Sequence, residues 1–156
     1  MSFAKIYTRG LLGLHAPLIE VEVHVSQGLP SLTIVGLPEA AVRESKDRVR
    51  SAIINSGFQF PTKRLTINLA PADLPKDGSR LDLPIALGIL IASGQIPENT
   101  TDNLEFIGEL ALDGQLRPIT GILSIAIACQ QLGHQLILPE QNAEQASKLP
   151  HFEVFA

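Results

Sequence analysis

Apolar and polar residues alternate in two stretches of the chain, and this pattern predicts half-buried β-strands. Residues 18–25, LIEVEVHV, place their aliphatic side chains on one side and Glu20, Glu22 and His24 on the other. Residues 64–69, RLTINL, alternate in the same way. Each strand is therefore expected to bury one face against a core and to leave the other face polar.

A third β-rich run, residues 31–36 with the sequence SLTIVG, follows the turn SQGLP. A short turn of this kind between two strands favours an antiparallel hairpin. We therefore expect the strand at 18–25 to pair with the strand at 31–36. A further strand, residues 4–9 with the sequence AKIYTR, is expected nearby.

Helical signals separate these strands. Pro38 suits the first turn of a helix because its φ is fixed, and Gly57 marks the end of the same helix after Ser56. A strongly apolar helix follows the segment PKDGSR and ends at Ser93 and Gly94. Two more helices are expected, from residue 120 or 121 to about residue 132 and over about residues 140–148.

The dipeptide Asp113-Gly114 is a strong two-residue hairpin signal between residues 106–112 and 115–119. The order of elements is then strands, helix, strand, helix, hairpin, helix, strand. This order predicts an α+β fold with a single mixed β-sheet and helices on one face. With 156 residues, no internal repeat and no linker, residues 1–156 are expected to form one domain.

The amino-acid composition indicates what kind of side chains fill the core and in which cellular compartment the protein is expected. Hydrophobic residues make up 45% of the chain but aromatic residues only 4%, so the core must be aliphatic. The single cysteine, Cys129, lies in the apolar run IAIAC, which indicates a buried, inert thiol and a reducing compartment. The N-terminus has no apolar signal-peptide segment, and polar residues interrupt the uncharged stretch 118–139. We therefore expect a cytoplasmic protein without a membrane span.

Charge is distributed unevenly although the net charge is only −4. Between residues 43 and 80 there are eight Lys or Arg residues against four acidic ones. On the predicted helix, Arg43, Lys46 and Arg50 form one stripe. A solvated helix surface with Glu39–Arg43 and Glu44–Arg48 pairs explains this stripe, and it is the commoner arrangement; a polyanion surface is the alternative. The candidate DNA or partner contacts are Arg43, Lys46, Arg50, Lys63, Arg64, Lys76 and Arg80.

The segment PKDGSR contains the one serine that invites comparison with a nucleophile, Ser79. A serine nucleophile needs a base, and Lys76 is the only lysine close to it in sequence. Helix capping is the favoured role: Ser79 followed three residues later by Asp82 resembles a capping box, and Asp82 itself is the other candidate cap. The chain has no P-loop motif, and its four histidines lack metal-ligand spacing, so no metal site is expected.

Three long blocks of the sequence resemble one protein family. They are GLPSLTIVGLPEAAVRESKDRVRSAI, RLTINLAPADLPKDGSRLDLPIALGIL and IGELALDGQLRPITGIL. In this order they resemble the Lon-like, ChlI-type N-terminal domain of the ComM/YifB group of magnesium-chelatase-like AAA+ ATPases, from residue 3 to residue 148. Where that group has Phe after GSR, this chain has Leu81. The resemblance implies the topology of the Lon proteolytic domain, which is similar to domain 2 of a ribosomal protein.

The comparison with Lon also implies the loss of its catalytic dyad. Lon-type domains carry Pro-Lys-Asp-Gly, a small residue and then the nucleophilic serine; here Arg80 stands at the serine position. The Lon lysine follows a Pro-Ile-Gly-Gly-Leu run; the matching run here is PITGIL, and Leu123 stands at the lysine position. The resemblance therefore implies a noncatalytic domain without a cofactor of its own.

The resemblance further implies a parent protein whose AAA+ module, absent from this chain, binds ATP and Mg. The expected partners are that module, neighbouring subunits of a hexameric ring, and DNA during branch migration in natural transformation. Two alternatives remain open at this point. One is a pure assembly or chaperone-type interaction module, and the other is a diverged serine peptidase using Ser79 with Lys76 or Asp77.

Overall fold

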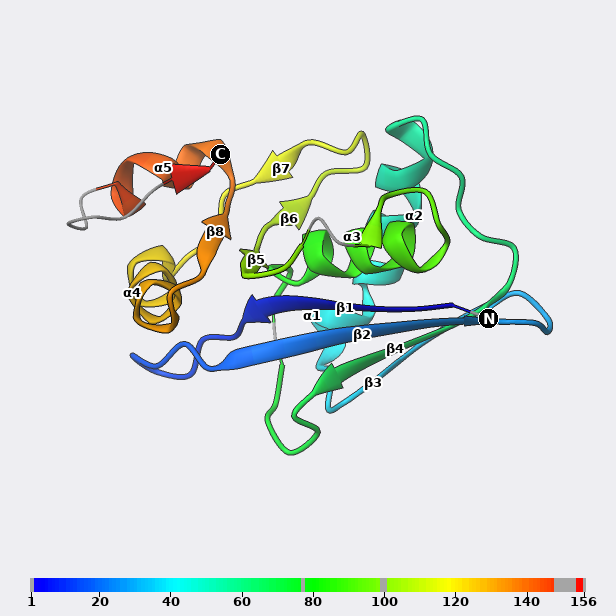
Figure 1. Cartoon of the computed structure of the whole chain (residues 1–156), viewed down its shortest axis with the longest axis horizontal. Coiled ribbons are helices and arrows are strands. Elements are labelled where there is room, and N and C mark those ends of the chain that lie inside the picture. Colours follow the sequence, from blue (N-terminus) through cyan, green and yellow to red (C-terminus); the bar gives the residue numbers. More distant parts are fainter. Residues whose placement is uncertain (1, 77, 99–100, 148–153, 156) are drawn as a thin grey trace.

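The computed structural model describes residues 2–76, 78–98, 101–147 and 154–155. A seven-stranded mixed sheet has the strand order β3-β4-β2-β1-β5-β8-β9, and β6 and β7 form a separate two-stranded sheet. Figure 1 shows helices α2 and α3 over the first four strands, and α4 and α5 at the other end of the molecule. The strands are β1 (Ser2–Arg9), β2 (Leu18–Ser26), β3 (Ser31–Val35), β4 (Arg64–Ala70), β5 (Leu104–Phe106), β6 (Glu109–Leu110), β7 (Leu116–Arg117), β8 (Gln135–Ile137) and β9 (Val154–Phe155). The helices are α1 (Ala40–Arg43), α2 (Ser45–Asn55), α3 (Asp82–Ala92), α4 (Ile122–Leu132) and α5 (Glu140–Ala146).

Strand β2 is the centre of the N-terminal half of the sheet. It pairs antiparallel with β1 on one side and antiparallel with β4 on the other. In this register Val21 lies opposite Ile6 and Leu69, so the aliphatic face of β2 continues across three strands. The alternating patterns of residues 18–25 and 64–69 are thus confirmed as half-buried strands.

The predicted hairpin between 18–25 and 31–36 is wrong, because β4 lies between β2 and β3. Strand β3 instead runs parallel to β4, with Ile34 opposite Ile67. Strands β1 and β4 are longer than β3, and they pair with the two sides of β2. The five-residue β3 therefore lies at the outer edge of the sheet. The close approach of β3 to β4 also requires Gly36, since a Cβ there would lie 2.1 Å from the Leu69 carbonyl oxygen.

Helix α3 packs directly on the aliphatic face formed by β1 and β2. Its helical Gly88 permits this approach, because a Cβ at that position would lie 2.6 Å from Val23 Cγ2. Helix α2 lies beside α3, and Val49 and Ile53 join the same core cluster. Among the described residues this core is built almost entirely from aliphatic side chains, as the composition predicts.

The helix predicted from Pro38 onward begins later and is divided. The backbone around Pro38 pairs with Lys76: Glu39 N donates to Lys76 O at 2.9 Å, and Lys76 N donates to Leu37 O at 3.2 Å. This pairing keeps Pro38 extended, so α1 starts at Ala40. A turn at Glu44 then separates α1 from α2.

The Asp113-Gly114 hairpin is confirmed, although its strands are only two residues long each. Glu109 pairs with Arg117, and Ala111 N donates to Gln115 O at 2.8 Å across the turn. Phe106, the first residue of the predicted hairpin, belongs instead to β5 in the main sheet, where β5 runs parallel to β1. The hairpin therefore projects from the sheet toward α2 and α3.

The α+β class with a mixed sheet is confirmed, but the helices do not all lie on one face. Along β8, Ile137 packs against the cluster under α2 and α3, whereas Leu136 packs in a second cluster with residues of α4. Since neighbouring residues of a strand point to opposite faces, α4 covers the face opposite α3. Cys129 is buried in this second cluster, and burial raises the pKa of its thiol to about 12, as expected for an inert thiol.

None of the helices in the described part of the chain combines the length and the apolar run that a membrane span requires.

Candidate functional site at the start of helix α3

The segment between β4 and α3 is held at both ends by backbone hydrogen bonds. On one side Lys76 pairs with residues 37–39. On the other side Gly108 N donates to Arg80 O at 3.0 Å, and Leu83 N donates to Gly108 O at 3.1 Å. Between them Gly78 adopts a φ of +77°, a conformation that favours glycine. The first turn of α3 is therefore fixed between two distant parts of the chain.

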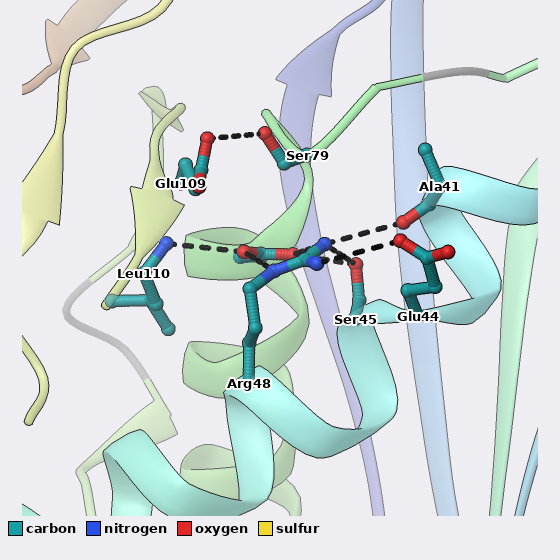
Figure 2. Close-up of polar contacts among 8 residues, drawn as sticks. Ala41, Glu44, Ser45, Arg48, Ser79, Glu109 and Leu110 are labelled. Carbon is teal, nitrogen blue, oxygen red and sulfur yellow. Dashed lines mark hydrogen bonds and ion pairs between the residues drawn. The ribbon is translucent and has the colours of Figure 1, made fainter. Parts of the chain in front are cut away.

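Asp82, the first residue of α3, is fully buried and accepts four hydrogen bonds. Arg48 of α2 donates from Nε to Oδ2 at 2.7 Å and from Nη2 to Oδ1 at 3.1 Å. Ser45 Oγ donates to Oδ1, and Leu110 N of β6 donates to Oδ2 at 3.1 Å. Figure 2 shows this arrangement, in which α2, α3 and β6 meet at one carboxylate. The hydrogen bond to Asp82 raises the pKa of Arg48 above its ordinary value, so the guanidinium stays charged.

The predicted caps are therefore wrong for both residues. Leu81 occupies the cap position of α3, and no side chain bonds the free N–H groups there. The Asp82 carboxylate points to Arg48 instead, because an ion pair with several donors is stronger than a single capping bond. Ser79 Oγ donates to Glu109 Oε2 at 2.6 Å and so ties the loop to β6 (Figure 2).

Arg80 extends toward the segment that precedes α4. Its Nη1 donates to Thr120 O at 3.0 Å, and its Nη2 lies 3.4 Å from Thr120 Oγ1. Thr120 stands three residues before Leu123, which lies in the first turn of α4 with 37% of its surface exposed. The structure thus brings together the two segments in which the resemblance to Lon predicts the dyad positions, Arg80 and Leu123.

Lys76 is not a surface contact, which corrects its place among the candidate DNA contacts. It is 1% exposed, and its Nζ donates to the carbonyl oxygen of Pro71. Burial lowers the pKa of the Lys76 ammonium, and the charge of Asp73 opposes that shift. Local sequence carries no signal for this burial, because Lys76 lies in a polar turn between Pro75 and Gly78.

Lys76 should make stability depend on pH on the alkaline side. Since its pKa in the folded state lies below the ordinary 10.5, the unfolded chain binds more protons between these two values. The free energy of unfolding then rises with pH over that interval. Lys76→Met is expected to flatten this rise in chemical denaturation at a series of pH values up to 10.5, with the exposed Lys63→Met as the control. If the free energy of unfolding of Lys76→Met rose with pH as steeply as that of the unaltered chain, Lys76 would not be the group responsible.

The other basic candidates divide into separate groups. Lys46, Arg50 and Lys63 line one hollow beside α2, which we call the basic hollow. Arg43 on α1 and Arg64 at the start of β4 are exposed but do not line it. Arg80 is half-buried against Thr120 and belongs to the loop site. Of the two predicted helical pairs, Glu44–Arg48 is present at 4.0 Å, and no ion pair joins Glu39 to Arg43 among the described residues.

A second buried ionic group lies at the other end of the sheet and was not predicted. Glu105 of β5 is fully buried and accepts from Arg9 Nε at 2.8 Å and from Arg9 Nη2 at 3.0 Å. His134 Nδ1 lies 2.8 Å from Glu105 Oε2. The only trace of this group in the sequence is a charged residue between the apolar Leu104 and Phe106 of a short strand.

Comparison with known proteins identifies the family. A family model described as subunit ChlI of Mg-chelatase matches residues 21–142. The chain is 52% identical over 147 residues to competence protein ComM of Haemophilus influenzae, which covers 94% of this chain and 29% of that protein. It is 54% identical over 145 residues to protein YifB of Escherichia coli, with 93% and 29% covered. The chain belongs to this magnesium-chelatase-like family.

This family membership confirms the resemblance to the ComM/YifB group that the three sequence blocks predicted. The match falls in the N-terminal part of ComM and YifB, and the chain spans about 29% of their length. A more distant relative is Lon protease of Chloroflexus aurantiacus, which is 30% identical over 142 residues, covering 85% of this chain and 17% of that protein. The Lon-like fold is thereby confirmed, and it agrees with the mixed sheet described above.

Proposed function

We propose that this chain is a noncatalytic Lon-like domain that supports ring assembly and DNA processing by a magnesium-chelatase-like AAA+ ATPase. The observation that carries the noncatalytic part is the contact between Arg80 and Thr120. It joins the two segments that hold the dyad in Lon, yet Arg80 and Leu123 supply neither a nucleophile nor a base. The site keeps the architecture of an active centre without its chemistry.

The diverged-peptidase alternative finds little support in the loop. Ser79 donates to Glu109 at 2.6 Å, whereas the Lys76 ammonium is bonded to the Pro71 carbonyl. Among the described residues, no lysine is therefore bonded to Ser79 to take its proton. Asp77, the other candidate base, lies outside the described residues. Covalent labelling of Ser79 by an activity-based serine probe, lost in Ser79→Ala, would contradict the noncatalytic proposal.

The proposal assigns the ATPase chemistry to the part of the parent protein beyond this chain. A P-loop motif is absent from these 156 residues, and relatives of the same family are more than three times as long. ATP and Mg are expected to bind that module, and neighbouring subunits of a hexameric ring are the expected partners. The name of the Haemophilus relative, competence protein ComM, supports natural transformation as the process served, and branch migration is the DNA-processing step that we propose within it.

A DNA contact by this domain is the second part of the proposal. Arg43, Lys46, Arg50, Lys63 and Arg64 are exposed or half-exposed on a chain with a net charge of −4. Guanidinium and ammonium groups bind phosphate oxygens irrespective of base sequence. The rival within this proposal is an assembly module that touches protein alone.

Binding of the purified chain to single-stranded and branched DNA across a salt series tests this part. Affinity is expected to fall linearly with salt on logarithmic axes, and replacement of Arg43 or Arg64 by Glu should lower the slope by about one unit per lost phosphate contact. Arg117→Glu, an exposed residue of the β6–β7 hairpin, is the matched control. Undetectable binding at low salt would favour the assembly module.

A further inference from the structure

Two neighbouring hollows lie on the surface beside α2. The basic hollow has a volume of about 220 Å³ and contains Lys46, Arg50 and Lys63 in its lining. The adjoining hollow has a volume of about 630 Å³ and is lined in part by Phe58, Gln59 and Ser93. Residues 60–63 line both, so this loop is the shared wall between a basic compartment and an amphipathic one.

The basic hollow offers uncompensated positive charge. Three cations line it together with one carboxylate, that of Asp47. Within the described ranges, Lys46, Arg50 and Lys63 have no carboxylate within ion-pair distance. Arg50 lies with its guanidinium carbon 5.1 Å from the centroid of the Phe60 ring, and this contact holds the guanidinium at the rim of the hollow. Such a set of donors matches a phosphate group.

Hydrogen bonds fix the two residues that precede this wall, Phe58 and Gln59. Gln59 N donates to Gln95 Oε1 at 2.9 Å, and Gln95 Nε2 donates back to Gln59 O at 2.8 Å. The same Nε2 lies 2.9 Å from Ser93 Oγ, and Phe58 N donates to Ile53 O at 3.2 Å. These bonds tie residues 58 and 59 to the segments that end α2 and α3, so a ligand would not have to order these two residues on binding.

The adjoining hollow has the character of a base site. Phe58 lines it with 37% of its surface exposed, which leaves ring surface for stacking. The side-chain amide of Gln59 makes no hydrogen bond to the rest of the described chain, so its donor and acceptor are available to a ligand. The two volumes together lie within the range of small-ligand sites.

We infer that these hollows bind one nucleotide unit, with its phosphate in the basic hollow and its base against Phe58 and Gln59. This rests on the proposed contact with DNA and narrows it to a site that reads an unpaired base. The same chemistry fits two sources, a free nucleoside monophosphate or a nucleotide within a single strand. A base inside a duplex does not fit, because its face is already stacked.

The test uses a fluorescein-labelled oligo-dT strand with the chain, followed by anisotropy, and competition by dTMP, thymidine or inorganic phosphate. Phe58→Ala is expected to weaken strand binding about 5-fold or more, as for the loss of one stacked base. Lys63→Glu should weaken it about 10-fold and reduce the salt slope by about one unit. Arg117→Glu and Leu29→Ala, both exposed and outside either hollow, should change nothing.

The competition experiment distinguishes a free nucleotide from a single strand as the ligand, and it also distinguishes the nucleotide site from the proposed DNA contact. Inhibition by dTMP that exceeds inhibition by thymidine and by phosphate supports the nucleotide site. Binding of dTMP with no strand binding at any salt would identify a free nucleotide as the ligand and contradict the proposed DNA contact. Strand binding that is indifferent to Phe58→Ala and Lys63→Glu would overturn the inference and leave the DNA contact standing elsewhere. Equal competition by phosphate and dTMP, together with an unaffected Phe58→Ala, would also overturn it.

Discussion

Replacement of Asp82 by alanine is expected to lower the free energy of unfolding by about 3 kcal/mol or more. The change removes a buried carboxylate and leaves the Ser45 hydroxyl and the Leu110 N–H without their acceptor. The Arg48 guanidinium, whose side chain is 21% exposed, loses its two bonds to Asp82 and keeps the weaker contacts with the Ala41 carbonyl oxygen at 3.2 Å and the exposed Glu44 at 4.0 Å. Removing one partner of a buried ion pair costs more than the pair itself contributes. Chemical denaturation monitored by circular dichroism measures the loss.

Two variants make this result specific. Glu44→Ala removes the exposed carboxylate that lies 4.0 Å from the same Arg48, and it should cost about 0–1 kcal/mol. The double variant Arg48→Met with Asp82→Leu removes both charges, and it should recover much of the stability lost in Asp82→Ala. A double variant as unstable as the single one would show that the hydrogen bonds of Ser45 and Leu110, rather than the stranded charge, dominate the loss.

Glu105→Ala should lower the free energy of unfolding at least as much, by about 3–5 kcal/mol, because Arg9 and Glu105 are both nearly inaccessible to solvent. The Arg9 side chain is 8% exposed and would keep only its bond to the Ala16 carbonyl at 3.0 Å. His134 would lose its partner in the same step. The expected outcome in denaturant titration is a lower midpoint with little change of slope.

The surface pair Lys5–Glu20 provides the matched control for Glu105. It also involves β1, but its atoms lie 4.0 Å apart and its side chains are 41% and 38% exposed. Glu20→Ala is expected to cost less than about 1 kcal/mol. Similar losses in Glu20→Ala and Glu105→Ala would mean that burial does not govern these pairs.

The chain's own periodicity determined its elements and their buried faces. Alternation in residues 18–25 and 64–69 marked the sides of β2 and β4 that face the aliphatic core, because a strand presents successive residues to opposite faces. Asp113-Gly114 placed the β6–β7 turn, since few dipeptides adopt its backbone easily. The blocks around PKDGSR and PITGIL identified the family, and their resemblance to Lon predicts that Arg80 and Leu123 stand at the dyad positions.

The sequence could not settle which strands pair or which polar groups are buried. Alternation describes a face but not its neighbour, so β3 was assigned to β2 although it lies against β4. Capping rules favoured Asp82 as a local cap, whereas its partners stand 34 and 37 residues away on α2. Lys76 looked like a surface cation for the same reason, because local polarity carries no information about what folds over it.

Sequence by itself therefore determined the class of fold and the family. Only the tertiary structure decided that Asp82 joins α2, α3 and β6, that Lys76 is withdrawn from the surface, and that Lys46, Arg50 and Lys63 line one hollow. The reason is physical. Propensity and periodicity act over one or two turns of chain, whereas burial and ion pairing depend on segments brought together from tens of residues apart.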